Sequence, residues 1–368
     1  MAWKLIELKA LKPFFFGRHN VFTNTHYAVS EYFPQQTQIM GALRLYWMEQ
    51  NKLMRVHKDG KYVPHEKKPY AVNLVGDVGS TNFQYYDNLG CIKAISPMFV
   101  LKKENECIKD AFFEIPSDIV KKCTNKVAIP KVLQGIVSDK PTVLLCDYDA
   151  KEGFVSGLAG ADFWRAYIDY EASGFVYGHD TLFEPYEQVG IGLKNKQVVK
   201  GQFYTKQSYK LTKNHSFGLL IDIDDDKLKE LDDKNDTNKK QEYMPLADGI
   251  ISLGADSSMF TLNISDIPSC IATHPLIENI QCKTQKQGTK IVLLSDSILD
   301  ESIDTHAFFQ IVQGKVPFKM LASRSGTKSN EKLLVPRGSV YYFKSNTQLQ
   351  DAKCAYAKMG FNHYLTLN

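Results

Sequence analysis

Short apolar segments separated by turn-forming residues recur along almost the whole chain, and this pattern restricts the chain to a fold rich in short strands. Two pairs of these segments flank a polar turn, and each pair predicts a β-hairpin. The first hairpin covers residues 98–115, and the second covers residues 188–209 about a turn at 194–196. The single strands that the pattern predicts are residues 3–8, 215–223, 249–253, 259–264, 290–294, 339–344 and 364–367.

Helical periodicity is confined to a few segments. In residues 37–53, the apolar side chains of Ile39, Leu43 and Trp47 repeat at a spacing of four, which predicts an amphipathic helix. Residues 161–170 predict a second, shorter helix. The chain therefore opens with a strand, a long loop and a helix, and its mixture of strands and helices predicts an α+β fold.

An acidic and polar segment divides the chain, whose 368 residues suit two domains. Residues 222–233 contain seven acidic residues and two lysines, so this segment has a net charge of −5 and the rest of the chain has +9, against +4 for the whole. Large apolar residues are nearly absent from residues 224–242, which is typical of a linker or an exposed insertion. We predict domains at 1–223 and 245–368 joined by a linker or insertion at 224–244. The basic remainder favours a polyanionic partner.

The cysteines and the N-terminus indicate the compartment. The chain has seven widely spaced cysteines, and no two of them have the Cys-x-x-Cys spacing. This argues against a disulfide framework or a zinc knuckle and favours a reducing cytoplasm. Charges at Lys4, Glu7 and Lys9 interrupt any apolar signal segment, and no apolar run approaches the roughly 18 residues of a membrane span. We therefore expect a cytoplasmic protein without a membrane partner.

Most signatures of hydrolases and nucleotide-binding enzymes are missing from the sequence, including GxxxxGK[ST], HExxH and GxSxG. The acidic segment places Asp222, Asp224 and Asp226 at positions one, three and five of a possible calcium loop. The sixth position is Lys227, where the sharp turn of such a loop needs a glycine. We therefore expect no catalytic residue, no metal site and no cofactor.

Basic and aromatic residues alternate in the first loop, where residues 12–27 are KPFFFGRHNVFTNTHY. Single-stranded RNA is held by cations on its phosphates and by aromatic rings against its bases. At least two of the three consecutive phenylalanines are expected in the core, whereas packing explains Arg18 and His19 less easily. An alternative is that His19 or His26 serves as the acid or base of a ribonuclease.

Glycines and cations gather in three other places. Gly41 lies inside the predicted first helix, where glycine costs about 1 kcal/mol relative to alanine. It predicts a close neighbour, either a packed strand or a nucleic-acid backbone, and we expect Arg44 on the same face. Residues 315–326 (KVPFKMLASRSG) and 336–344 (PRGSVYYFK) combine cations with small residues that allow close approach to phosphate. The alternative is that these two segments are ordinary surface loops and that Gly41 lies at a contact between the helix and a sheet.

Several of these segments together resemble a known family. In order, the chain contains PFFFGRHN, YFPQQTQIMGALR, YEQVGIGLKNKQVVKGQFYTKQSYKL, LGADSSMF, LLVPRGSVYYFK and KMGFNHY. Their order and spacing are similar to those of the third Cmr subunit of type III-B CRISPR complexes, in the RAMP superfamily. One segment departs from the family pattern of LGG followed by an acidic residue, Gly and Arg. Residues 253–258 lack the second Gly and the Arg, so we do not include them among the site residues.

The resemblance implies two ferredoxin-like (RRM-like) RAMP domains with β-hairpin insertions, one of which forms a thumb. It implies a non-catalytic subunit that binds the 5′ repeat-derived tag of the CRISPR RNA (crRNA). The implied partners are the large polymerase-like Cmr subunit and a backbone Cmr subunit, within a ribonucleoprotein for antiviral defence. The residues expected to contact RNA are Arg18, His19, Gln38, Gly41, Arg44, Lys315, Arg324, Arg337, Gly338 and Ser339.

Three other functions stay open at this point. The equivalent subunit of a type III-A complex would share the fold and the contacts with the tag. A RAMP-type endoribonuclease that processes crRNA would need His19 or His26. A β-rich interaction module without an RNA role would show no salt-dependent binding of RNA.

Overall fold

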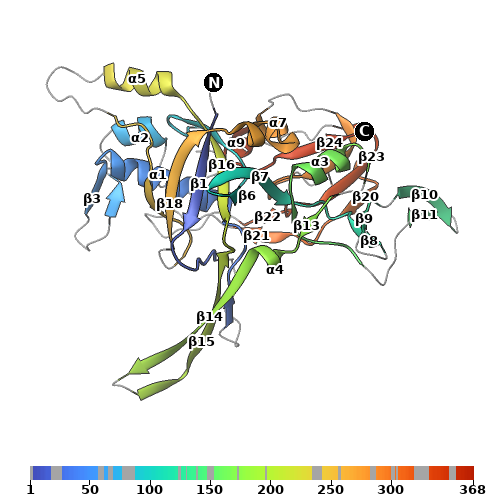
Figure 1. Ribbon diagram of the computed structural model, residues 1–368, viewed down its shortest axis with the longest axis horizontal. Coiled ribbons are helices and arrows are strands. Elements are labelled where there is room, and N and C mark those ends of the chain that lie inside the picture. The colour runs from blue at the N-terminus through green and yellow to red at the C-terminus, as the bar shows by residue number, and fades with distance from the viewer. Residues whose placement is uncertain are drawn as a thin grey trace.

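The computed structural model shows an α+β protein built from antiparallel sheets with helices packed against them (Figure 1). The predicted fold class is confirmed at this level. No helix in the part of the chain that the structure describes is long and apolar enough to cross a membrane. The structure describes residues 3–17, 27–56, 62–64, 69–76, 88–122, 126–129, 131–137, 140–146, 153–171, 174–194, 197–233, 243–255, 258–281, 287–299, 303, 306–318, 331–347 and 354–368.

Nine strands of the described chain form one sheet, which we call the larger sheet. Its order is β13-β12-β7-β6-β16-β1-β18-β17, and β5 also pairs with β16. Strand β1 lies between β16 and β18 and is antiparallel to both, so that Leu5 is opposite Leu220 on one side and Ser265 on the other. The strands are β1 (Trp3–Ala10), β5 (Ile92–Ile95), β6 (Phe99–Glu104), β7 (Cys107–Glu114), β12 (Leu158–Ala159), β13 (Val176–Tyr177), β16 (His215–Ile223), β17 (Gly249–Ser252) and β18 (Met259–Asp266).

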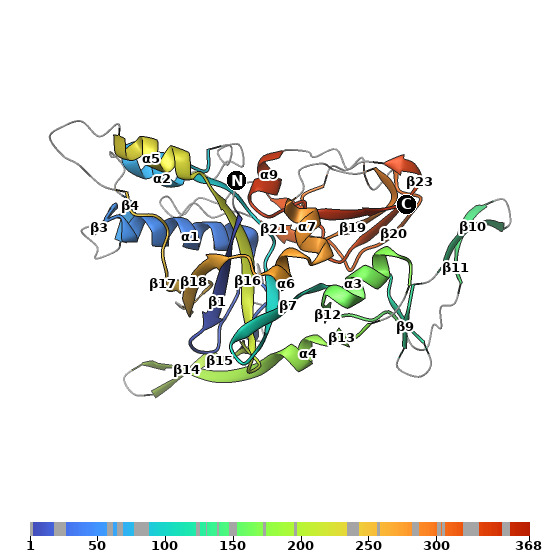
Figure 2. The same ribbon diagram turned by 45° about the horizontal axis from the view of Figure 1, so that its top comes forward.

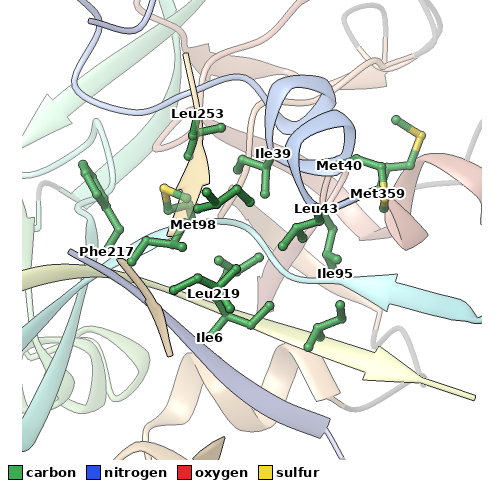
Figure 3. Packing of buried hydrophobic residues seen from close by; sticks show 14 of the residues in the cluster. Ile6, Ile39, Met40, Leu43, Ile95, Met98, Phe217, Leu219, Leu253 and Met359 are labelled. Carbon is green, nitrogen blue, oxygen red and sulfur yellow. The ribbon is translucent and has the colours of Figure 1, made fainter. Parts of the chain in front are cut away.

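Helix α1 (Gln36–Gln50) covers one face of the larger sheet. Its apolar residues Ile39 and Leu43 face the sheet and pack in one cluster with Ile6 and Leu219, as Figure 3 shows. This burial confirms the helix that the spacing of four predicts, and it contributes on the order of 2 kcal/mol for each large apolar side chain. The helix begins one residue earlier than predicted.

Four strands form the smaller sheet, with the order β20-β23-β19-β24. Helix α7 (Pro275–Gln281) and helix α3 (Ala161–Ile168) pack between this sheet and the larger one. Leu5 and Phe113 of the larger sheet share a buried cluster with Val292 and Leu365 of the smaller sheet. The two sheets therefore share one core. The strands are β19 (Gly288–Leu293), β20 (Phe309–Ile311), β23 (Val340–Thr347) and β24 (Tyr364–Leu367).

Both predicted hairpins are confirmed. Strands β6 and β7 pair within the larger sheet, whereas β14 (Phe183–Lys194) and β15 (Gln197–Leu211) form a long hairpin that extends away from the body of the protein (Figures 1 and 2). Strand β2 (Tyr27–Val29) runs parallel to β15 and pairs with it near the body. We call the β14–β15 hairpin the arm.

The predicted linker does not separate the two sheets. Strands β17 and β18 follow it in sequence but pair in the larger sheet, next to β1. Within the linker, residues Asp225–Asp233 form helix α5, which buries Leu228 and exposes Asp225 and Asp226. The division into domains at 224–244 therefore stays a prediction, and the sheet pairing does not follow it.

The remaining elements are short, and the pattern of the sequence did not predict them. They are β3 (Met54–Val56), β4 (Tyr62–Pro64), α2 (Pro69–Val75), β8 (Val120–Lys122), β9 (Lys126–Ala128), β10 (Lys131–Val137), β11 (Lys140–Cys146), α4 (His179–Leu182), α6 (Ser269–Ala272), β21 (Val316–Phe318), β22 (Lys332–Leu334) and α9 (Cys354–Lys358).

A buried histidine makes the fold sensitive to acid. Burial, with Arg165 nearby, lowers the pKa of His274 from its usual 6.5 to about 3. Between these values the unfolded chain binds a proton that the folded chain does not, so stability is complete above pH 6.5 and falls as the pH decreases toward 3. The loss is about 1.4 kcal/mol for each pH unit.

We expect His274→Asn to remove this contribution, because the Asn oxygen replaces Nδ1 as the acceptor of the Leu276 N–H, a bond of 3.1 Å. Urea unfolding at pH 7.5, 6.0 and 5.0 should show a smaller pH dependence in the variant than in the wild type. His306→Asn, at an exposed position, is the control. Equal pH dependence of the wild type and His274→Asn would contradict the assignment.

Candidate nucleic-acid interface

The three predicted site residues on α1 have different surroundings. Gly41 is exposed, Gln38 is partly exposed, and Arg44 is buried, with 7% of its surface accessible. Arg44 Nη2 donates to the carbonyl oxygen of Asn88 at 3.5 Å. Gly41 and Arg44 are three residues apart on the helix, but they differ in burial. The exposed stripe of α1 continues from Gly41 to Leu45, and Arg44 lies on the buried flank of the helix.

Gly41 is a glycine that the fold does not require. Its backbone is helical, and no described atom lies within 4 Å of the position that a Cβ would occupy. Among the described residues, no packed strand requires glycine here. Because glycine inside a helix costs about 1 kcal/mol relative to alanine, its presence is not explained by the stability of the described chain.

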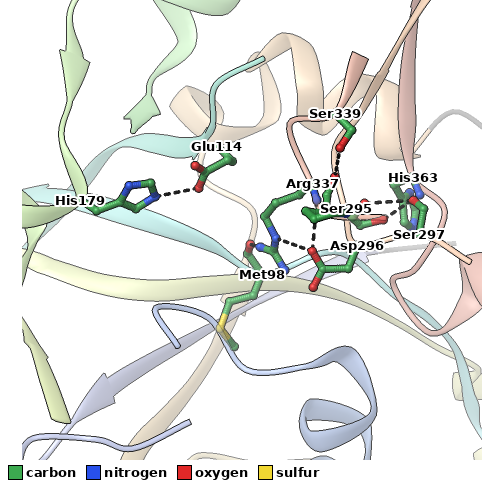
Figure 4. Close-up of polar contacts among 10 residues, drawn as sticks. Met98, Glu114, His179, Ser295, Asp296, Ser297, Arg337, Ser339 and His363 are labelled. Carbon is green, nitrogen blue, oxygen red and sulfur yellow. Dashed lines mark hydrogen bonds and ion pairs between the residues drawn. The ribbon is translucent and has the colours of Figure 1, made fainter. Parts of the chain in front are cut away.

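Arg337 inserts into the protein next to the segment that leads into α1 (Figure 4). Its Nη1 donates to the carbonyl oxygen of Met98 at 3.2 Å, and its Nε donates to Asp296 Oδ1 at 3.3 Å. The guanidinium carbon lies 4.7 Å from the ring centroid of Phe33, which is a cation–π contact. Only 9% of the side chain is exposed. Arg337 thus joins the C-terminal part of the chain to the first loop.

Residues 336–339 form a turn that is clamped against the segment after β7. The Ser117 N–H donates to the Gly338 carbonyl at 2.7 Å, and the Gly338 N–H donates to Leu293 O at 2.7 Å. Gly338 has a φ of +80°, and a Cβ there would lie 2.8 Å from the carbonyl oxygen of Ile115. Ser339 is fully buried, and its hydroxyl donates to Pro336 O at 2.7 Å. The fold therefore accounts for both the glycine and the serine.

A cluster that the sequence did not indicate lies at the base of the arm. His179 Nε2 is 3.0 Å from Glu114 Oε2, as Figure 4 shows. The His179 ring stacks on Tyr32 with centroids 4.7 Å apart and an interplanar angle of 8°. Tyr32 also packs against Tyr209 of the arm, at 4.7 Å between centroids. These contacts hold the arm against β7 and the first loop.

The arm exposes apolar side chains and carries a partly buried lysine at its base. Tyr186 and Val189 on β14 are 48% and 61% exposed. On β15, Lys206 Nζ lies 4.8 Å from the ring centroid of Phe15 in the first loop. The neighbouring Phe14 and Phe16 are fully buried, which confirms that two of the three consecutive phenylalanines belong to the core.

The other predicted site residues are placed as follows. Lys315 is exposed just before β21. Arg18, His19 and Arg324 lie outside the described residues. The structure thus brings Arg337 next to the first loop, places Gly338 against the segment after β7, and places Arg44 against Asn88 on the flank of α1. For all of these residues, contact with RNA stays a prediction.

The fold is that of a helix-covered antiparallel sheet protein with an extended hairpin arm. The sequence matches the family of CRISPR-associated proteins Cas_Cmr3 over residues 6–368, so the chain belongs to this family. No curated protein sequence matches the chain.

Two solved structures have the same fold. Both are chains of type III-B Cmr-β complexes bound to cognate target RNA, one of them also with AMPPnP. Their TM-scores are 0.53 with AMPPnP and 0.52 without it. Each is 13% identical in sequence, and each match covers 99% of this chain and 96% of the other.

We expect Gly338→Ala to destabilise the protein more than Gly153→Ala. Both glycines have a left-handed backbone, with φ of +80° and +71°, which costs an alanine about 1–2 kcal/mol. Only at Gly338 does the added methyl group meet a backbone oxygen, whereas no described atom lies within 4 Å at Gly153. Urea unfolding of the two variants measures the difference. Equal losses would show that the turn does not pack against Ile115 as described.

Proposed function

We propose that this chain is a non-catalytic subunit of a type III-B Cmr effector complex that binds the 5′ repeat-derived tag of crRNA. It would bridge the large polymerase-like subunit to a backbone subunit. Membership of the Cas_Cmr3 family supports this proposal. The two solved structures with the same fold are from Cmr-β complexes bound to cognate target RNA, which is consistent with it.

The observation that carries the proposal is Gly41. The residue is exposed on a 15-residue helix, and neither its backbone conformation nor a described neighbour requires glycine. A small residue without a structural cause is explained if a ligand backbone approaches the helix there. Gln38 lies one turn earlier and is partly exposed, so it would supply a polar side chain to the same ligand.

Cations would neutralise the phosphates around this position. Lys315 is exposed in the described chain, and Arg18, His19 and Arg324 are proposed from the sequence. Arg44, Arg337, Gly338 and Ser339 are bonded within the protein, which favours a role beneath the interface.

The arm is our candidate for the thumb that the family resemblance implies. It extends from the body, whereas the β6–β7 hairpin is part of the larger sheet (Figure 1). The exposed Tyr186 ring would stack on a base, and Lys206 would lie near a phosphate. The stack of His179, Tyr32 and Tyr209 would fix the direction of the arm.

We also propose that the chain contains two ferredoxin-like units. Helix α1 covers one face of the larger sheet, and α7 packs against the smaller sheet. This layering supports the proposal, because ferredoxin-like units pack helices on one face of an antiparallel sheet.

The proposal predicts a steep dependence of RNA affinity on salt. Each neutralised phosphate of a single strand contributes roughly −0.7 to the slope of log affinity against log salt. We expect a tagged RNA to bind more tightly than an untagged RNA of equal length at every salt concentration, because some bases of the tag are read. Fluorescence anisotropy of the purified protein, or of the assembled complex, measures both quantities.

Two results would contradict this function. Equal affinity for tagged and untagged RNA would exclude recognition of the tag. Cleavage of repeat RNA by the purified protein, lost on His19→Ala or His26→Ala, would make the chain an endoribonuclease instead.

We expect Gly41→Ala to stabilise the free protein and to weaken its binding of RNA. Alanine gains up to about 1 kcal/mol in the helix and meets no described atom. A methyl group would, however, keep an RNA backbone from close approach. Thermal unfolding and anisotropy measure the two effects, with Glu49→Ala, exposed on the same helix, as the control. A stabilised Gly41→Ala protein that binds RNA as well as the wild type would remove the observation on which the proposal depends.

A further inference from the structure

An ion pair is buried where the two sheets meet. Lys290 Nζ is 2.6 Å from Asp118 Oδ2, and the two side chains are only 2% and 0% exposed. Asp118 follows β7 of the larger sheet, whereas Lys290 is on β19 of the smaller sheet. Two charges removed from water this completely are stable only with good geometry and further hydrogen bonds.

Tyrosines from both sheets' sides supply hydrogen bonds to Asp118, and tyrosine rings surround the Lys290 ammonium. Tyr167 of α3 donates to Asp118 Oδ1 at 3.0 Å, and Tyr342 of β23 donates to Asp118 Oδ2 at 2.6 Å. Lys290 Nζ lies 4.4 Å from the ring centroid of Tyr167, 5.4 Å from that of Tyr342 and 5.6 Å from that of Tyr170. Burial lowers the pKa of Lys290, and the attraction of Asp118 opposes this shift. We call Asp118, Lys290, Tyr167 and Tyr342 the interlock.

The interlock contributes more to the position of the two sheets relative to one another than to the free energy of unfolding. A buried ion pair contributes little beyond what well-packed apolar residues would contribute, but it is satisfied in only one arrangement of its groups. Here two groups come from the side of the larger sheet and two from the smaller sheet. A shift of one sheet past the other would separate the charges inside the core.

The interlock is connected to the candidate interface through backbone hydrogen bonds. Ser117, next to Asp118, donates its N–H to Gly338 O at 2.7 Å. The turn at 336–339 leads directly into β23, the strand that carries Tyr342. Arg337, in that turn, reaches Met98 in front of β6. A displacement of the smaller sheet would therefore move this turn relative to the first loop and α1.

We infer that Asp118, Lys290 and Tyr342 are positioning residues for RNA. They hold the smaller sheet, and with it the 336–339 turn that leads into β23, at the position relative to α1 that one RNA strand requires. None of the three touches the RNA. The inference rests on the proposed function, because it assigns these residues to the placement of the same interface.

The test compares two lysine substitutions. Lys290→Met breaks the ion pair between the sheets. Lys103→Met breaks a matched pair inside the larger sheet, since Lys103 Nζ on β6 lies 2.9 Å from Glu7 Oε1 on β1, with 17% and 11% of the side chains exposed. Each variant loses one positive charge and the ion pairs that it makes, which for Lys103 include a second contact of 3.6 Å with the exposed Glu106, so both are expected to be less stable than the wild type. Hydrogen exchange of the Ser117 amide and a salt series with tagged RNA are then measured on both.

We expect faster exchange at Ser117 and weaker RNA binding in Lys290→Met alone. For each phosphate that the variant no longer neutralises, affinity at 0.15 M salt should fall about fourfold and the slope should become shallower by roughly 0.7. Lys103→Met should keep the affinity and the slope of the wild type. If Lys290→Met does not fold, Tyr342→Phe keeps the ring, removes one bond to Asp118, and should change exchange and slope in the same direction.

The outcomes separate the two proposals. If the wild type binds tagged RNA but Lys290→Met, or Tyr342→Phe in its place, keeps the wild-type slope and affinity, the positioning role is wrong and the proposed function stands. The same conclusion follows if Lys103→Met loses RNA binding to the same extent, because loss of stability would then be the cause. If the wild type itself shows no salt-dependent binding of tagged RNA, the proposed function fails, and the positioning role toward RNA fails with it.

Discussion

The antiparallel pairing of β1 with both β16 and β18 is the constraint on which the rest of the structure depends. It joins the start of the chain to strands on either side of the acidic segment, so that segment must leave the sheet after Ile223 and return at β17. Successive side chains of β1 point to opposite faces of the sheet, so β1 contributes to the buried clusters on both faces. Ile6 packs in the cluster under α1, whereas Leu5 packs in the cluster shared with the smaller sheet. One short strand therefore fixes the helix on one face and the second sheet on the other.

Local pattern was enough to predict several elements with a strongly apolar sequence. Strands β16 and β24 have the predicted bounds, and α1 begins within one residue of its predicted start. The partners of the strands were beyond prediction, because pairing depends on residues far away in the chain. Strand β2, with three residues, is specified by β15 and by little in its own sequence. The return of β17 and β18 to the larger sheet is another pairing of this kind, and it explains why the predicted linker does not separate the sheets.

The sequence predicted the residue types of the candidate site better than it predicted which of those residues are exposed. Cations beside small residues drew attention to Arg44 and Arg337, but each lies buried against a backbone carbonyl that no local pattern shows. The interlock was missed because Asp118 and Lys290 are more than a hundred residues apart. The sequence does contain one weak indication of the interlock. Lys290 comes directly before the apolar end of its strand, and a lysine beside such a run must find a partner if it is buried.

Gly41 and Gly338 show how structure separates a ligand contact from a requirement of the fold. Both were selected for the same reason, since glycine permits close approach. At Gly338, the left-handed backbone and the carbonyl of Ile115 account for the glycine without a ligand. At Gly41, neither cause is present among the described residues. Burial separates the cations, because Arg337 is buried and Lys315 is exposed. The surface offered to RNA is thus best defined by those residues whose identity the fold leaves unexplained.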